Sequence, residues 1–124
     1  MKESRTVRTL GHHSLIELSG CDPEKLKRVV GVRRAMLEAA RRANGTIVKA
    51  VFHAFSPWGV SGVVVIAESH LTIHTWPEHG YAAVDVFSCS PKLQQSEVRK
   101  WLAKEFGARR TKTVRLRRGP QAVG

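Results

Sequence analysis

Apolar residues occur along this chain in short runs that alternate with polar residues or stop at turn residues, a pattern typical of β-strands. Valine, isoleucine, threonine and phenylalanine, which favour strands, are concentrated in these runs. The predicted strands are residues 10–18, 46–55, 60–66, 71–75, 81–87 and 111–116. The segment SPWG at residues 56–59, and Pro77 with Gly80, predict turns between strands, because proline and glycine interrupt a ladder of hydrogen bonds.

Two further segments place apolar residues at helical spacing. The first begins at the Asp-Pro pair of residues 22–23, since aspartate caps a helix and proline fits its first turn, and it ends at the Asn-Gly pair of residues 44–45. Gly31 is expected to weaken or split this helix. The second helix is predicted to begin at the Ser-Pro pair of residues 90–91 and to end before Gly107.

The predicted elements are a strand and a helix, then four strands, then a helix and a strand. This order predicts an α+β fold, a two-layer α/β sandwich with helices on one face of a mainly antiparallel sheet. At 124 residues we expect a single domain over residues 1–124, near the size at which a partner subunit often completes a sheet face. Residues 1–9 are predicted to be a flexible arm and residues 117–124 a basic tail.

The formal net charge is +11, and lysine and arginine are concentrated in the first helix and near the C-terminus. Clustered basic residues bind phosphate backbones, so a non-catalytic nucleic-acid-binding protein is one interpretation. We favour a solvated basic surface, because neither the ligand spacing of a zinc finger nor an aromatic RNA-binding motif accompanies the charges. We therefore expect neither a nucleic-acid partner nor a bound metal.

Cys21 and Cys89 are the only cysteines, too few for the disulfide framework of a small secreted domain. The first residues lack the apolar core of a signal peptide, and no apolar run is long enough to span a membrane. These features predict a cytoplasmic protein with reduced thiols and no membrane partner.

Reactive side chains are concentrated in residues 67–89, where serine, histidine, glutamate and cysteine lie close together in the sequence. Taken singly, these residues and the nearby Ser61 have structural explanations. Ser61 suits a turn, His74 suits the polar face of a strand, and Cys89 suits the core. Together they exceed what a core requires, so a catalytic site is the stronger hypothesis.

Three segments carry a family resemblance: FSPWGVSG at residues 55–62, ESHLTIHTWPE at residues 68–78 and YAAVDVF at residues 81–87. They closely resemble the small prokaryotic S-adenosylmethionine decarboxylase proenzymes. The resemblance covers residues 10–89, which is too long and specific for chance to be a good explanation.

The resemblance implies a cofactor made from the chain itself. Decarboxylation of an amino acid leaves a carbanion, and a carbonyl that forms a Schiff base with the substrate amine delocalises this charge. In the family, the carbonyl is a pyruvoyl group derived from a serine, here Ser69. Its hydroxyl attacks the carbonyl of Glu68, and β-elimination from the resulting ester cleaves the proenzyme autocatalytically between Glu68 and Ser69.

The same resemblance implies roles for three more residues. His74 is the implied base of the elimination step, and Ser61 is an implied helper of processing. A histidine with a near-neutral pKa suits proton transfer of this kind. Cys89 is the implied donor that returns a proton to the α-carbon after carbon dioxide leaves.

The implied substrate is S-adenosylmethionine, whose decarboxylated product feeds spermidine synthesis. Adenine requires flat apolar surfaces and ribose requires an acceptor, so Phe55 and Trp76 are candidates for stacking and Glu78 for hydrogen bonding. Each of the three could instead belong to the core or the rim. The family also implies a homodimer of cleaved protomers, with sites near the subunit interface.

The chain departs from the family at Ala54, Ala67 and Ser90, and further after Cys89. None of these differences removes a residue that the chemistry requires, but they leave the substrate less secure. Relatives of the same fold and cleavage chemistry that decarboxylate arginine or ornithine provide the alternative interpretation.

Overall fold

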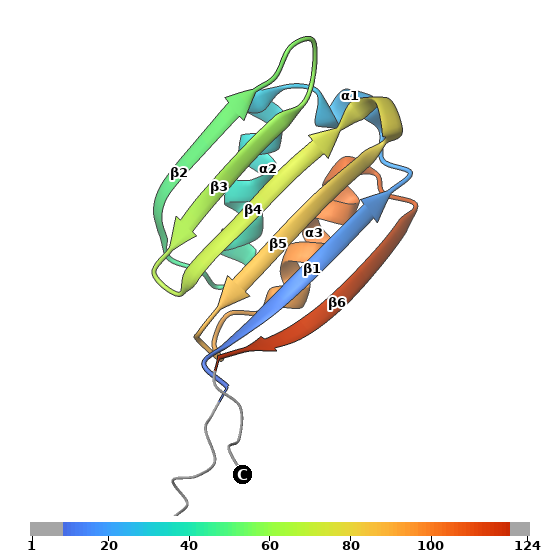
Figure 1. The fold of residues 1–124 in the computed structure, drawn as a ribbon. Coiled ribbons are helices and arrows are strands. Elements are labelled where there is room, and N and C mark those ends of the chain that lie inside the picture. Colours follow the sequence, from blue (N-terminus) through green and yellow to red (C-terminus); the bar gives the residue numbers. More distant parts are fainter. Residues whose placement is uncertain (1–8, 120–124) are drawn as a thin grey trace, which may run out of the picture.

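A six-stranded sheet forms one layer of the computed structural model, which describes residues 9–119 (Figure 1). The strands are β1 (Gly11–Ser19), β2 (Ile47–Ala54), β3 (Val60–Ile66), β4 (Ser69–Trp76), β5 (Tyr81–Ser88) and β6 (Arg110–Arg118). Their spatial order is β2-β3-β4-β5-β1-β6, and each neighbouring pair is antiparallel. The strands from β2 to β5 therefore form a meander, and β1 lies between β5 and β6.

The second layer consists of helices on one face of the sheet (Figure 1). They are α1 (Pro23–Leu26), α2 (Val29–Arg42) and α3 (Gln95–Phe106), and the 3-10 turn η2 (Pro77–His79) joins β4 to β5. Figure 1 shows α3 behind β5 and β1, while β6 extends beyond it as an edge strand. The predicted α+β sandwich is confirmed.

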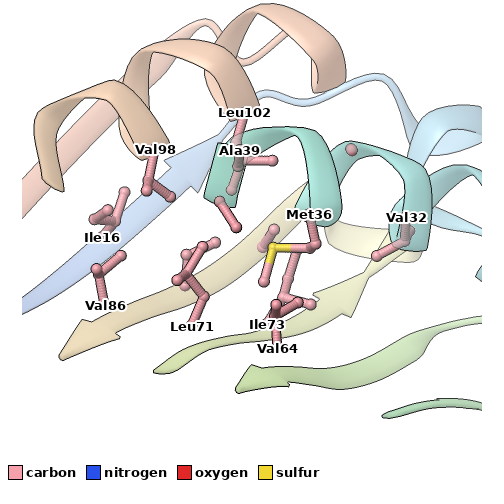
Figure 2. Packing of buried hydrophobic residues seen from close by; sticks show 14 of the residues in the cluster. Ile16, Val32, Met36, Ala39, Val64, Leu71, Ile73, Val86, Val98 and Leu102 are labelled. Carbon is pink, nitrogen blue, oxygen red and sulfur yellow. The ribbon is translucent and has the colours of Figure 1, made fainter. Parts of the chain in front are cut away.

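The core lies between the two layers, as Figure 2 shows. Met36 and Ala39 of α2 and Leu102 of α3 point toward the sheet, where they meet apolar side chains of the central strands. Fully buried members from the sheet include Ile16, Val64, Leu71, Ile73 and Val86. Alternation along each strand directs these side chains to the helices and their neighbours to the opposite face.

That opposite face, here called the open face, is not covered by any helix of the described residues (Figure 1). Large apolar side chains are exposed on it, including Val51, Val65, Val114 and Leu116, which retain 54%, 39%, 44% and 45% of their surface. These exposed apolar side chains lie toward the two edges of the face, on β2 and β3 at one side and on β6 at the other.

The first predicted helix is divided, but the break lies before Gly31. Lys27 and Arg28 separate α1 from α2, and Gly31 itself lies inside α2. The predicted start is confirmed, because the Asp22 carboxylate accepts a hydrogen bond of 3.0 Å from the Glu24 N–H.

The second helix begins at Gln95, five residues later than predicted. The Ser88 hydroxyl accepts a hydrogen bond from the Ser90 N–H at 2.9 Å, and the Ser90 hydroxyl accepts one from the Lys92 N–H at 3.1 Å. Serine side chains thus satisfy main-chain donors locally and compete with helix formation, which explains the delayed start.

The last strand is longer than predicted and corrects the expected tail. Arg117 and Arg118 belong to β6, where they pair with His12 and Gly11 of β1. The remainder of the predicted tail beyond Gly119, and residues 1–8 of the predicted arm, lie outside the described residues.

Candidate active site

Ser69 follows a tight turn between β3 and β4 and has a strained main chain. Its φ angle is 150°, a region that residues with a side chain rarely adopt. Ser69 opens β4 and stands opposite Ile66 on one side and Ser88 on the other, so paired strands hold this conformation in place. The peptide bond between Glu68 and Ser69 therefore lies where the chain stores strain.

The side chain of Glu68 is held away from this bond. Its carboxylate accepts hydrogen bonds from the Thr46 N–H at 3.1 Å and the Thr46 hydroxyl at 3.4 Å. The main-chain hydrogen bond from Thr46 lowers the pKa of Glu68. The side chain thus anchors the turn, and the carbonyl of Glu68 is left to interact with Cys89, the residue that follows β5.

Cys89 contacts both Glu68 and Ser69, the two residues of the predicted cleavage reaction. Its main-chain N–H donates a hydrogen bond of 3.2 Å to the Glu68 carbonyl oxygen, and its thiol donates to the same oxygen at 3.5 Å. The Ser69 hydroxyl lies 4.0 Å from the Cys89 sulfur. Two donors aimed at one carbonyl oxygen polarise the carbonyl and stabilise negative charge that develops on it.

Ser61 and His74 form a second pair, on the open face. They are opposite each other in β3 and β4, and the Ser61 hydroxyl lies 2.6 Å from His74 Nδ1. His74 is five residues along β4 from Ser69, a distance of roughly 16 Å at the rise of a β-strand. One chain therefore brings Ser69 to Cys89 and Ser61 to His74, but it does not bring the two pairs together.

A pocket of about 330 Å³ lies beside the second pair. It is lined by Phe55, Trp58, Gly59, Ser61, His74, Thr75, Trp76 and Glu78. The three predicted substrate contacts thus meet around the Ser61–His74 pair. Phe55 and Trp76 retain 51% and 40% of their surface, so both rings are available to a ligand.

Neighbouring aromatic rings orient the two predicted stacking residues. Trp76 stacks on Tyr81, with ring centres 5.3 Å apart and an angle of 29° between the planes. The ring of Phe55 meets His53 edge-on at 4.7 Å. Fixed aromatic faces of this kind suit stacking on a planar ring.

Sequence reasoning treated Trp58 only as part of a turn. The structure places its ring in the pocket lining, with the Lys27 ammonium 4.9 Å and the Arg28 guanidinium 5.3 Å from the ring centre. A large aromatic residue in a turn, where small residues suffice, was the signal that could have identified it.

Thr75 fixes the wall of the pocket. Its buried hydroxyl accepts a hydrogen bond from the Val60 N–H at 2.9 Å and donates one to the Leu26 carbonyl at 2.9 Å. Val60 precedes Ser61, and Thr75 lies between His74 and Trp76. The contact therefore ties both strands of the pocket to the end of α1.

A polar cluster at the centre of the open face was not predicted. The Tyr81 hydroxyl donates a short hydrogen bond to Glu17, and the Thr72 hydroxyl donates one of 3.1 Å to Asp85. Desolvation, followed by the hydrogen bond and charge of Glu17, raises the pKa of Tyr81 to about 12. Tyr81 is therefore a proton donor to Glu17 across the ordinary pH range.

The two cysteines differ in environment. Cys21 is buried, and desolvation raises the pKa of its thiol to about 11, whereas Cys89 is exposed. Across residues 9–119, no group of three or more His, Cys, Asp or Glu side chains is placed to bind a metal. Within the same range, no helix has the length and apolar character needed to cross a membrane.

Comparison with known proteins identifies the family. The S-adenosylmethionine decarboxylase proenzyme of Acidithiobacillus ferrooxidans is 53% identical over 113 residues, which are 91% of this chain and 85% of the relative. The proenzyme of Thermodesulfovibrio yellowstonii is 49% identical over 110 residues, which are 89% and 82% of the two chains.

A solved structure is also similar to this fold. The crystal structure of the adenosylmethionine decarboxylase from Aquifex aeolicus matches with a TM-score of 0.84 and 36% identity, over 92% of this chain and 94% of that chain. A family model described as S-adenosylmethionine decarboxylase covers residues 12–119. As the resemblance predicted, this chain belongs to the S-adenosylmethionine decarboxylase family of enzymes.

Proposed function

We propose that this chain is a proenzyme that cleaves itself at Glu68-Ser69 and then decarboxylates S-adenosylmethionine with a pyruvoyl group derived from Ser69. The observation that carries the proposal is the contact of Cys89 with the Glu68 carbonyl, next to the strained main chain of Ser69. The similarity to relatives that are S-adenosylmethionine decarboxylase proenzymes supports the same activity.

The cleavage begins when the Ser69 hydroxyl oxygen attacks the Glu68 carbonyl carbon. The Cys89 N–H stabilises the oxyanion, and the C–N bond then breaks to give an ester and a free amine on Ser69. A base removes the proton on the Ser69 α-carbon, and elimination releases the carboxylate of Glu68. The dehydroalanine that remains tautomerises to an imine, and water converts the imine to a pyruvoyl group with loss of ammonia.

The residues present around Ser69 fit such a group. A pyruvoyl carbonyl supplies the electron sink that decarboxylation needs. The Cys89 thiol, 4.0 Å from the Ser69 hydroxyl, stands where a proton can be returned to the substrate α-carbon. Because this role requires a free thiol, the proposal places the enzyme in the reducing cytoplasm.

We propose that the active unit is a homodimer in which the partner supplies Ser61 and His74. In this dimer two sheets pack face to face, and the two-fold axis lies between them, perpendicular to the strands. The strands of the partner therefore run in the opposite direction. The end of β4 that carries Ser69 then faces the end of the partner's β4 that carries the His74 pair. The open face supports this packing, because no helix of the described residues covers it and it exposes apolar side chains toward both edges.

The pocket favours S-adenosylmethionine over the alternatives arginine and ornithine. Phe55 and Trp76 offer exposed aromatic faces for a purine and for the positive charge of the sulfonium group, and the Glu78 carboxylate can accept from ribose hydroxyls. Arginine and ornithine have neither a purine nor a ribose. We propose that the product serves as the aminopropyl donor in spermidine synthesis.

Product identification tests the substrate. Purified, cleaved protein is incubated separately with S-adenosylmethionine, arginine and ornithine, and the amine is identified by mass spectrometry. We expect decarboxylated S-adenosylmethionine from the wild type and Ser19→Ala, a serine outside the site, and no product from Ser69→Ala. Formation of agmatine or putrescine instead would overturn the substrate assignment.

A further inference from the structure

A second pocket lies on the helix side of the sheet, between α3 and the edge strand β6. It has a volume of about 430 Å³. Its polar lining consists of Ser14 from β1, Gln95, Ser96 and Arg99 from α3, and Thr113 and Arg115 from β6. None of these residues lines the pocket beside Ser61 and His74.

The charge of this pocket is positive and uncompensated. Arg99 and Arg115 come from different elements and line the same cavity, and no carboxylate belongs to its lining. The salt bridges found among residues 9–119 include neither arginine. Glu97, the acidic residue in the first turn of α3, pairs instead with Lys100 at 3.4 Å. A cavity lined by two arginines and by no carboxylate favours the binding of an anion.

The floor of the pocket is polar, buried and already ordered. Ser14 is 2% exposed and donates a hydrogen bond of 2.5 Å to the side-chain oxygen of Gln95, which is 8% exposed. The Gln95 amide nitrogen donates in turn to the His12 carbonyl at 3.0 Å. Because Gln95 is fixed on both sides, the beginning of α3 is held rigidly against β1.

Further hydrogen-bond donors belong to residues that line the same cavity. The side-chain hydroxyls of Ser96 and Thr113 belong to its lining. Gln95 and Ser96 are the first residues of α3, a helix of 12 residues with no side-chain cap, so their main-chain N–H groups and the helix dipole also favour negative charge. Two planar guanidinium groups with hydroxyl and amide donors match the oxygen atoms of a phosphate group.

We propose that this pocket binds a small phosphorylated ligand through its phosphate group, separately from the decarboxylation site. The volume exceeds that of inorganic phosphate and lies in the range of pockets that hold small metabolites. Arg99 and Arg115 grip the phosphate, and Ser96 and Thr113 bond its remaining oxygen atoms.

Isothermal titration with inorganic phosphate and with pyrophosphate, at constant ionic strength, tests the proposal. We expect one saturable site per chain for at least one of the two anions in the wild type. Arg99→Gln and Arg115→Gln should each weaken binding about ten-fold or more, because each removes a charge-assisted contact. Arg110→Gln removes the same charge from β6 outside the pocket and should change binding less than about two-fold.

Circular dichroism and thermal unfolding check that every variant is folded. Absence of saturable binding of both anions to the wild type would overturn the proposal. Equal weakening by Arg110→Gln would also overturn it, because diffuse surface charge would then explain binding. Binding of nucleic acid alone, with an affinity that Arg99→Gln does not change, would overturn it as well. None of these outcomes bears on decarboxylation, so the two proposals fail separately.

Discussion

Cys89 contacts the proposed cleavage site through two groups that mutation can separate. The main-chain N–H reaches the Glu68 carbonyl, while the thiol lies near the Ser69 hydroxyl. Cys89→Ser keeps the N–H and replaces the thiol by a weaker acid. We expect this variant to cleave itself but to turn over S-adenosylmethionine about 100-fold more slowly or worse.

Gel electrophoresis of the purified variant and release of labelled carbon dioxide measure the two steps. Cys21→Ala, which alters the buried cysteine, is the control and should retain both. Loss of cleavage in Cys89→Ser would mean that the thiol, rather than the main chain, activates Glu68.

Tyr81 provides a pH prediction, because it is the only tyrosine of the chain. Burial and the neighbouring Glu17 carboxylate raise its pKa in the folded protein to about 12, from the ordinary tyrosine value of 10.0. A raised pKa means that folding favours the protonated form, so this contribution to stability is fully present below pH 10 and is lost as the pH rises toward 12. Ultraviolet absorbance of tyrosinate should therefore show a midpoint near pH 12 while circular dichroism remains native.

Glu17→Gln should lower that midpoint, since the carboxylate contributes to the shift through its hydrogen bond and its charge. A wild-type midpoint near pH 10 in protein that is still folded would contradict the contact between Tyr81 and Glu17.

Among the elements, β3 depends on a glycine that the sequence alone did not mark. A Cβ atom on Gly62 would lie 2.0 Å from the ring of Phe52 on β2, which is far closer than any real contact. Gly62→Ala must therefore displace the ring or the strand and should reduce the free energy of unfolding by about 1–3 kcal/mol.

Gly31→Ala is the matched control, because nothing lies within 4 Å of a Cβ atom at that position in α2. Alanine favours the helix, so this change should raise the free energy of unfolding by about 0.5–1 kcal/mol. Urea denaturation measures both variants. If both variants changed the free energy of unfolding in the same direction, the close approach of Phe52 to Gly62 would not explain the effect of Gly62→Ala.

The sequence predicted most elements because their patterns are local. The run Val60–Ile66 begins and ends where predicted, since a glycine turn precedes it and a tight turn follows it. The start of α3 was missed because two serine side chains form competing hydrogen bonds, a choice that depends on the loop as a whole.

Sequence reasoning also selected the residues that the structure gathers in two places. Phe55, Trp76 and Glu78 line one pocket with His74, and Ser69 contacts Cys89. The separation between these two places could not be predicted, because it depends on strand register and on the path of β4. The pocket between α3 and β6 was missed for the same reason, since its lining joins Ser14 of β1 to residues of α3 and β6 near the other end of the chain.

At the scale of the whole molecule, the proposed homodimer, in which the partner supplies Ser61 and His74, can be tested by mixing two variants. We expect Ser69→Ala and His74→Ala each to remain uncleaved when expressed alone. When the two are co-expressed, mixed dimers join the intact Ser69 of one chain to the intact His74 of the other. About half of the His74→Ala chains should then be cleaved, since random pairing places half of them in mixed dimers.

Mass spectrometry distinguishes the two variants and their fragments. Co-expression of Ser69→Ala with Ser61→Ala should rescue cleavage in the same way, because both processing residues come from the partner. A folded, mixed dimer without cleavage would place all processing groups within one chain.

The denatured mass of the purified wild-type protein shows whether the chain cleaves itself. We expect two chains that separate between Glu68 and Ser69, with a C-terminal chain that is blocked at its first residue and reacts with carbonyl reagents. Ser69→Ala should give one chain. A single wild-type species near 13.8 kDa that persists after long incubation would contradict self-cleavage between Glu68 and Ser69.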